Sequence, residues 1–383
     1  MNVRGFKRIP RKELIIHIGS AKTGSTALQK FLTENISFLY EAGICYPKSG
    51  RYSAYDHYYL FSAARPDEWY ASKDVGTFEE EWMPLVSELH EALSNGSEYG
   101  LLSCTGFLRF NREQLEKIRT WFSEFKIRIV YYLRRQDELL MSVISQAMKG
   151  GDPDVRDIKS GIESYSYLLD FATCLAPFED VFGEDSIQVL LFEKSQMVGG
   201  DVTQDFFSKV FNLMLKTEQI GKLPEENIGL VRDALEFKML LNKLDNTSLK
   251  LQNYQHLLER YSILSRKHGE DSWNDVSLLS PMERLNIIRK YNDCNTMIAN
   301  KYFGRVDGKL FYDPLPRETE PWAQYPGLSL SKSVEIADFI VGESIRDTGK
   351  QKMFTDKVTH ANSLQSRDSR IRRFLAILWN SIK

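Results

Sequence analysis

Two periodicities of hydrophobic residues alternate along the first 211 residues of the chain. Four short runs are almost continuously apolar and rich in β-branched or aromatic residues, as expected for strands buried on both faces of a parallel sheet. These runs are residues 14–18, 100–104, 127–133 and 187–192. Each run precedes a segment whose apolar residues recur at helical spacing, namely residues 28–39, 112–125, 137–149 and 201–211. The alternation predicts an α/β fold, a three-layer sandwich with a central parallel sheet.

Further helices and one linker are expected between these units. Residues 82–93 and 165–178 also show helical periodicity. The sequence Gly150-Gly151-Asp152-Pro153 ends the preceding helix and predicts a linker to about residue 162. Residues 41–47 form a short apolar segment that ends at a proline, and the loop that follows is rich in tyrosine and suits a substrate-facing wall.

The second half of the chain predicts a mostly helical part. Helical stretches are expected at residues 227–244, 248–265 and 281–301, the last with a capping box at Ser280 and Glu283. Residues 313–328 hold four of the twelve prolines, which predicts an extended connection.

A terminal helix is expected at residues 370–382, where apolar residues lie on one face and arginines on the other. Such a basic amphipathic helix fits peripheral contact with an anionic membrane. Docking on its own domain, or on a dimer partner, is the favoured interpretation, because the segment is short.

The composition fits a globular enzyme. The 50 lysines and arginines and the 52 aspartates and glutamates give a formal net charge of −2, so no basic field predicts a nucleic-acid partner. The four cysteines lie far apart without metal-binding or disulfide spacing, which favours reduced thiols. No apolar stretch reaches the ~20 residues that span a bilayer, and we expect neither a cleaved signal nor a membrane anchor. We therefore expect a cytoplasmic protein.

The most informative segment is the loop between the first predicted strand and its helix. Gly19 and Gly24 bracket this turn, and the helix follows directly after Thr26. Unpaired N–H groups and the positive end of the helix dipole converge at such a junction, so the loop predicts an anion site. The spacing is that of a P-loop, except that the lysine, Lys22, lies inside the loop and Ser25 follows the second glycine.

The segment from Lys22 to Thr26 resembles the KTGTT loop that binds the 5′-phosphosulfate in sulfotransferases. These enzymes use 3′-phosphoadenosine-5′-phosphosulfate (PAPS) as the sulfuryl donor. The resemblance implies that the phosphate is bound by Lys22, Thr23, Gly24, Ser25 and Thr26. It also implies a P-loop-like sandwich as the fold.

A second anion site is expected because PAPS carries a 3′-phosphate on its ribose. Sulfotransferases bind this phosphate with an arginine at a strand end and a serine eight residues later, and Arg134 and Ser142 match that spacing. The planar guanidinium suits the role, because it can donate two bonds to one phosphate. Gln136 stands where the family usually has a proline. Arg135 is either a second phosphate contact or the partner of Asp137 or Glu138 in a salt bridge.

The resemblance is to bacterial, carbohydrate-type members and covers residues 12–312. It implies a sulfotransferase domain with a PAPS-binding α/β core at about 12–220 and a helical part at about 224–312, followed by a C-terminal extension at 313–383. Many relatives have Ser-Ser-Glu at the end of the second core strand, where this chain has Ser103-Cys104-Thr105. Any role of that glutamate therefore does not carry over.

The function implied is transfer of a sulfuryl group from PAPS to a hydroxyl or amine of an acceptor, which leaves 3′-phosphoadenosine-5′-phosphate. The acceptor is expected to be a carbohydrate or glycolipid. Lys22 would stabilise charge on the bridging oxygen during an in-line displacement. His57 is the candidate general base, with Asp56 and Glu34 as alternatives, and His17 is interpreted as a core or supporting residue. No metal is expected, and Arg51, Tyr52, Tyr55, Tyr58 and Arg109 are candidates to line the acceptor cleft.

Two other functions stay open at this stage. A P-loop kinase or NTPase would bind Mg²⁺-ATP and would place its lysine after the second glycine. A nucleotide- or glycan-binding module without catalysis would fit the missing glutamate. The position of Lys22 and the Arg134–Ser142 pair favour the sulfotransferase.

Overall fold

The computed structural model describes residues 12–20, 22–51, 55–68, 71–216, 229–243, 254–268, 273 and 277–355. The chain divides into two compact units and crosses from one to the other five times. The first unit comprises Met1–Leu140, Tyr165–Pro224 and Arg284–Pro316, and the second comprises Met141–Ser164, Glu225–Glu283 and Arg317–Lys383.

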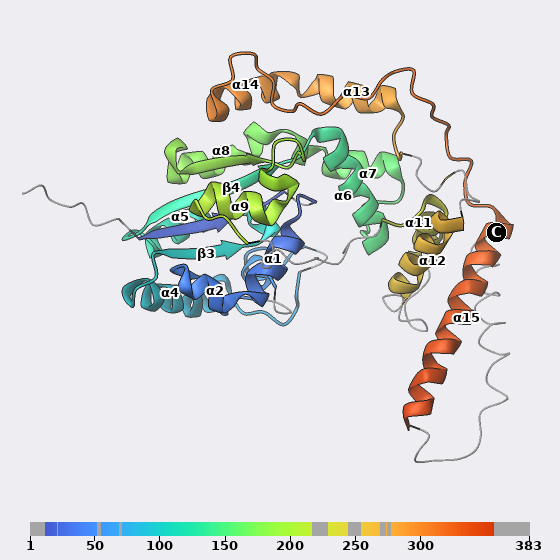
Figure 1. Ribbon diagram of the computed structural model, residues 1–383, viewed down its shortest axis with the longest axis horizontal. Coiled ribbons are helices and arrows are strands. Elements are labelled where there is room, and N and C mark those ends of the chain that lie inside the picture. Colours follow the sequence, from blue (N-terminus) through green and yellow to red (C-terminus); the bar gives the residue numbers. More distant parts are fainter. Residues whose placement is uncertain are drawn as a thin grey trace, which may run out of the picture. The chain divides into compact units, whose positions relative to one another are not determined.

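A five-stranded parallel sheet forms the centre of the first unit (Figure 1). Its spatial order is β2-β3-β1-β4-β5. The strands are β1 (Glu13–His17), β2 (Ile44–Cys45), β3 (Tyr99–Ser103), β4 (Lys126–Leu133) and β5 (Ile187–Leu191). The four predicted strands are therefore present, and β2 adds a short edge within the predicted apolar segment 41–47.

Helices surround this sheet, and the central strands are buried as their apolar sequences require. The predicted α/β class with a central parallel sheet is confirmed. Helices wholly within the first unit are α1 (Ser25–Glu34), α2 (Ile36–Glu41), α3 (Tyr58–Ala64), α4 (Phe78–Ser94), α5 (Arg112–Trp121), α8 (Phe171–Phe182), α9 (Val202–Phe211) and α14 (Asn292–Phe303). Helices α6 (Gln136–Gly150), α7 (Ile158–Tyr165) and α13 (Pro281–Lys290) each include a boundary between the units.

Helices α1 and α9 cover one face of the sheet. Their side chains, such as Phe31 and Phe207, share one apolar cluster with Ile15 of β1 and Val130 of β4. The rings of Phe31 and Phe207 meet edge to face, with their centroids 5.2 Å apart. This packing fixes the start of α1 next to the end of β1.

Helices α4 and α8 cover the opposite face. Alternate residues of a strand point to opposite faces, and Leu101 of β3 lies in the cluster with α1 and α9. A Cβ on the neighbouring Gly100 would instead lie 2.9 Å from Leu89 of α4. In β4, the Tyr131 side chain lies beside Cys174 of α8 in the same way. The sheet is therefore the middle of three layers.

The strand order creates a switch point between β1 and β4. The chain leaves β1 for one edge of the sheet, at β2, and leaves β4 for the other edge, at β5. Ligands of open α/β sheets bind beyond the carboxyl ends of the strands at such a point. The loop at Gly19–Gly24 follows β1, and Arg134 follows β4, so both predicted phosphate-binding segments lie at the expected edge.

The second unit is helical. It contains α11 (Arg232–Asn242), α12 (Gln255–His268) and α15 (Leu330–Thr355), together with most of α7 and the later part of α6. The ring of Tyr261 in α12 packs on Phe339 of α15 at a centroid distance of 5.4 Å, and its hydroxyl donates to Glu335 across 2.7 Å. The predicted helical C-terminal part is thus present, although α15 itself was not predicted.

Several predicted boundaries are wrong. The expected helix 28–39 is two helices, because Asn35 leaves helical geometry and its side chain donates to the carbonyl of Phe31. The expected helix 281–301 likewise breaks at Tyr291. Helix α7 begins inside the predicted linker and continues past its end to Tyr165, and the carboxylate of Asp157 accepts the Ser160 N–H near the start of the helix. Residues 166–169 form a 3₁₀ turn before Asp170 caps α8.

Some predictions lie outside the described residues. These include the terminal helix at 370–382 and the starts of the helices expected at 227 and 248. The division at residue 312 stays a prediction. Among the described helices, none has the length and hydropathy that spanning a bilayer requires.

Candidate active site

The loop between β1 and α1 is closed by its own polar groups. Lys22 and Gly24 have positive φ angles of 66° and 75°, so the backbone turns sharply twice within three residues. The Thr23 hydroxyl donates to the carbonyl of Ser20 across 2.6 Å. Ala21 lies outside the described residues. The turn delivers the chain directly into α1, which begins at Ser25.

The first turn of α1 has no side-chain cap. Its N-cap is Gly24, which has no side chain to accept from the first amide groups. Uncapped N–H groups at a helix N-terminus bind anions, since they point outward together with the positive end of the helix dipole. The first N–H groups of α1 therefore have no acceptor in the N-cap side chain, and a ligand can accept from them.

Gly24 is also required for packing. A Cβ at this position would lie 2.8 Å from Cγ1 of Val202 and 3.1 Å from Cε2 of Phe192. Any larger residue would push the loop away from α9 and the end of β5. The second glycine of the motif thus fixes both the turn and its close approach to the sheet.

A buried polar atom without a partner lies beneath the loop. Nε2 of His17 has no hydrogen-bond partner in the described part of the chain, although the residue is only 1% exposed. A Cβ on Gly19 would lie 3.2 Å from this atom and 3.0 Å from the Ser25 hydroxyl oxygen. The imidazole therefore faces the same small space as the start of α1, which independently indicates a ligand site.

The other nitrogen of His17 is held from β3. Its Nδ1 lies 2.8 Å from the Ser103 hydroxyl, which also accepts from the Gln29 side chain of α1 across 3.1 Å. Burial lowers the pKa of His17 to about 4. The imidazole is therefore neutral near pH 7, and its orientation is fixed by two other elements.

Arg134 joins the two predicted phosphate-binding segments. Its Nη1 donates to the carbonyl of Lys22 across 3.0 Å, and its Nε donates to Glu138 across 3.3 Å. The guanidinium also lies 5.6 Å from the ring centroid of Phe192. This arginine thus lies directly beside the loop.

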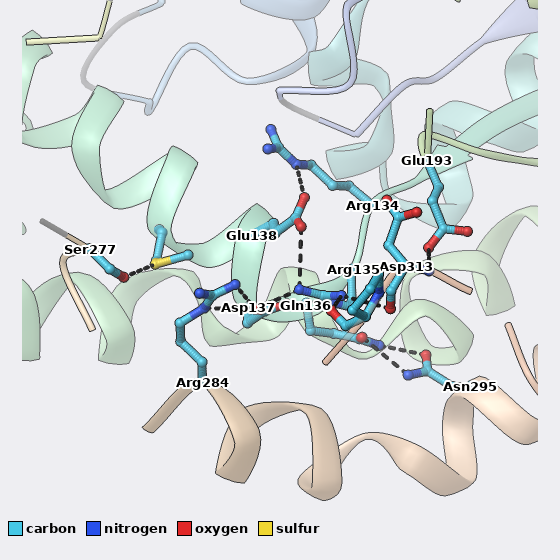
Figure 2. A network of polar contacts seen from close by, with 12 residues as sticks. Arg134, Arg135, Gln136, Asp137, Glu138, Glu193, Ser277, Arg284, Asn295 and Asp313 are labelled. Carbon is cyan, nitrogen blue, oxygen red and sulfur yellow. Dashed lines mark hydrogen bonds and ion pairs between the residues drawn. The ribbon is translucent and has the colours of Figure 1, made fainter. Parts of the chain in front are cut away.

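Arg135 has a structural role, because it forms the salt bridge that was one of its two predicted roles. Its Nε and Nη2 donate to Asp137, and its Nη1 donates to the carbonyls of Asp313 and Pro314 (Figure 2). Asp137 is completely buried and also accepts two bonds from Arg284. The salt-bridge alternative is therefore confirmed for Arg135.

The same network explains Gln136. Its side-chain amide exchanges two hydrogen bonds with Asn295 of α14, at 2.6 and 3.1 Å (Figure 2). A proline at this position could not make this pair. The partners Arg284 and Asn295 could not be predicted from the sequence, since they lie about 150 residues further along the chain.

Ser142 lies in α6, in the second unit. Its role as a partner of Arg134 stays a prediction. Binding of a 3′-phosphate by Arg134 likewise stays a prediction.

His57 lies at the start of α3 and is fully buried. Its Nδ1 lies 3.2 Å from the Ser103 amide, which donates to it, and its ring packs edge-on against Tyr46 at 4.9 Å. Burial lowers the pKa of His57 to about 3. His57, the candidate base, and His17, the predicted core residue, are thus both neutral and both contact Ser103.

The alternative bases differ in environment. Burial raises the pKa of the neighbouring Asp56 to about 6, despite backbone hydrogen bonds that favour its charged form. Glu34 is exposed at the far end of α1. With a rise of about 1.5 Å per residue, that position lies roughly 13 Å along the helix from the loop.

Two further sequence features can be located. Thr105, which replaces the glutamate of the resembled family, lies beside the loop, with its Cγ2 3.2 Å from a Cβ built on Gly19. Arg109, a candidate for the acceptor cleft, forms an ion pair with Glu68 at 2.9 Å and lies over the ring of Tyr167. Tyr52 is outside the described residues.

Within the described ranges, no group of three or more His, Cys, Asp or Glu side chains is placed to hold a metal ion.

Comparison with known proteins gives two similar proteins. No family model matches the chain. An uncharacterized protein of Archaeoglobus fulgidus is 24% identical over 263 residues, which cover 66% of this chain and 68% of that protein. The crystal structure of a sulfotransferase from Alicyclobacillus acidocaldarius aligns with a TM-score of 0.33 and 15% identity, over 55% of this chain and 88% of that one.

Proposed function

We propose that this protein is a PAPS-dependent sulfotransferase whose acceptor is a carbohydrate or glycolipid. One observation carries the proposal: an uncapped helix N-terminus and the unpartnered Nε2 of His17 share one space at the switch point of the sheet. The order of residues in the loop, with Lys22 inside it, supports a phosphosulfate rather than a nucleoside triphosphate.

The residues present fit the donor chemically. PAPS has two separate anionic groups, and bound PAPS supplies the activated sulfuryl group. Backbone N–H groups of residues 23–26 and the Thr23, Ser25 and Thr26 hydroxyls are donors suited to the 5′-phosphate. Arg134 lies one hydrogen bond from the loop and offers a guanidinium to the 3′-phosphate, and Ser142 of α6 is its proposed partner.

Lys22 is proposed to stabilise the charge that develops on the bridging oxygen as the sulfuryl group leaves. A cation held at that point acts more strongly in the transition state than in the ground state, which is the requirement for catalysis. Its backbone is fixed by the bond from Arg134, so the start of its side chain is held in place.

His57 is proposed to take the proton from the acceptor hydroxyl or amine. The imidazole is neutral at working pH, as a base must be, but its low pKa weakens its attraction for a proton. Asp56 is the second candidate, because its raised pKa lies closer to neutral pH.

Nucleotide binding by the full chain tests the proposal against the kinase alternative. Thermal denaturation is followed with 3′-phosphoadenosine-5′-phosphate, with AMP and with Mg²⁺-ATP. Selective binding stabilises the native state by mass action, so we expect the largest shift with the bisphosphate. A larger shift with Mg²⁺-ATP would contradict the proposal.

Turnover tests catalysis separately. Purified protein is incubated with PAPS and a panel of polysaccharides, glycolipids, small sugars and tyrosine peptides, and formation of the sulfated product is measured. Selective bisphosphate binding without turnover on any acceptor would favour the non-catalytic nucleotide-binding module.

A further inference from the structure

Arg134, the arginine directly after β4, already forms an ion pair with a carboxylate of the protein, that of Glu138. Oε2 of Glu138 lies 3.3 Å from Nε of Arg134, and its Oε1 lies 3.3 Å from Nη2 of Arg135. Figure 2 shows this carboxylate, from the first turn of α6, linked to both guanidinium groups. Carboxylate and phosphate oxygens accept the same charge-assisted hydrogen bonds. The Glu138 carboxylate therefore lies in a position that also suits the phosphate group of a ligand.

Arg135 is not able to receive a phosphate without losing its structural bonds. Asp137 accepts from its Nε and Nη2, and the carbonyls of Asp313 and Pro314 accept from its Nη1. The side chain is 6% exposed. At this strand end, Arg134 is therefore the arginine that can turn toward a ligand.

Two nitrogen donors of Arg134 already have acceptors within the protein. Its Nη1 donates to Lys22, and its Nε donates to Glu138. A phosphate gripped by two parallel bonds uses a pair of neighbouring N–H groups, and the Nε–Nη2 pair is one of the two such pairs on a guanidinium. A phosphate that binds this pair must displace Glu138.

Displacement is feasible because the Arg134–Glu138 pair is not deeply buried. The Glu138 side chain is 34% exposed and that of Arg134 is 24% exposed. An ion pair with this exposure stabilises the protein little, so the carboxylate can swing into solvent when a stronger anion arrives. Its negative charge stays close and opposes the phosphate.

We propose that Glu138 is a specificity-determining residue that competes with the 3′-phosphate of the nucleotide for Arg134. The inference rests on the proposed function, in which Arg134 binds that phosphate. It goes further, because the chain then limits its own affinity for every nucleotide with a 3′-phosphate, PAPS and the bisphosphate product alike. A nucleotide without a 3′-phosphate does not meet this competition.

The test is nucleotide titration of Glu138→Gln by calorimetry on the full chain. The probes are 3′-phosphoadenosine-5′-phosphate and AMP, which differ by the 3′-phosphate. The matched control is Glu116→Gln, which removes an i,i+4 pair of the same kind, with Arg112 at 2.9 Å on the exposed face of α5. Glu138→Ala is a second variant, and thermal midpoints verify that each variant folds.

We expect both Glu138 variants to bind the bisphosphate about ten-fold more tightly than wild type, with AMP affinity within about two-fold. Glu116→Gln should bind both probes like wild type. Unchanged or weaker bisphosphate binding in the Glu138 variants would overturn the inference, as would equal tightening toward AMP. Absence of bisphosphate binding in wild type and variants alike would instead overturn the proposed function.

Discussion

The Nη1 of Arg134 lies 3.0 Å from the carbonyl oxygen of Lys22, so the end of β4 is hydrogen-bonded to the loop that follows β1. This bond joins residues 112 positions apart. It lies at the switch point of the sheet, where ligands of α/β proteins bind. An anion bound by the loop and an anion bound by Arg134 would thus contact one hydrogen-bonded group of residues.

Replacement of Lys22 tests the catalytic centre. We expect Lys22→Ala to lower kcat with PAPS by about 10²–10³, the usual loss when one preorganised charge stabiliser is removed. Affinity for 3′-phosphoadenosine-5′-phosphate should change much less, since this product lacks the sulfuryl group. Steady-state kinetics and calorimetry separate the two effects.

The control for Lys22 is Lys30→Ala, which removes the same charge from the middle of α1. It should retain nearly the wild-type rate. Near-full turnover by Lys22→Ala would remove Lys22 from the mechanism.

The pH dependence of turnover distinguishes the two candidate bases. With His57 as the base, kcat should show no acid limb between pH 5 and pH 8, because its pKa is lowered to about 3 and the ring is neutral throughout. His57→Ala should then lower kcat by about 10²-fold or more. Asp56→Asn should retain most of the activity.

The opposite pattern would assign the base to Asp56. Its carboxyl group, with a pKa raised to about 6, would give an acid limb near pH 6 because the protonated form cannot accept a proton. Loss of this limb in Asp56→Asn, together with a mild effect of His57→Ala, would contradict the assignment to His57.

The buried carboxylate of Asp137 should be important for stability. Asp137→Asn removes the charge that pairs with Arg135 and Arg284, whose side chains are 6% and 18% exposed. Breaking a buried pair by removing one partner leaves the other charge uncompensated, and we expect a loss of about 3 kcal/mol in the free energy of unfolding. Urea denaturation measures it.

Asp180→Asn is the matched control for Asp137. Asp180 is 62% exposed and lies 3.8 Å from Arg112, so its replacement should change the free energy of unfolding by less than about 0.5 kcal/mol. Equal effects of the two substitutions would contradict the structural role of Asp137.

The buried imidazole of His17 should make the protein sensitive to acid. Burial lowers its pKa from 6.5 to about 4, so between these values the unfolded chain binds a proton that the native state excludes. Stability contributed by the neutral ring is therefore present above about pH 6.5 and falls as the pH decreases toward 4. Asp56, with its raised pKa, acts in the opposite direction, so a comparison of variants is needed.

His17→Gln should reduce the slope of the unfolding free energy against pH by about 1.4 kcal/mol per pH unit, which corresponds to the binding of one proton. Urea denaturation between pH 4.5 and pH 6.5 measures the slope. His268→Gln, on the exposed end of α12, should leave it unchanged. A wild-type slope in His17→Gln would contradict the buried, neutral state of His17.

The sequence by itself determined the strands, most helices and the anion-binding loop. These features are local: apolar runs of five to seven residues form the four predicted strands, and the glycines at positions 19 and 24 adopt two of the positive φ angles of the turn. A parallel sheet also brings the ends of β1 and β4 to the same edge, but only the observed strand order makes these two strands neighbours and so places Arg134 beside the loop.

Only the tertiary structure decided which side chains are available there. Arg134 and Arg135 are adjacent and chemically identical, yet the first faces the loop while the second is held by Asp137 and by the backbone near residue 313. The burial of His57 and the pairing of Gln136 with Asn295 were equally unpredictable. Apart from the bond of Arg135 to Asp137, these contacts join residues 46 to 178 positions apart, and local periodicity carries no information about contacts at that distance.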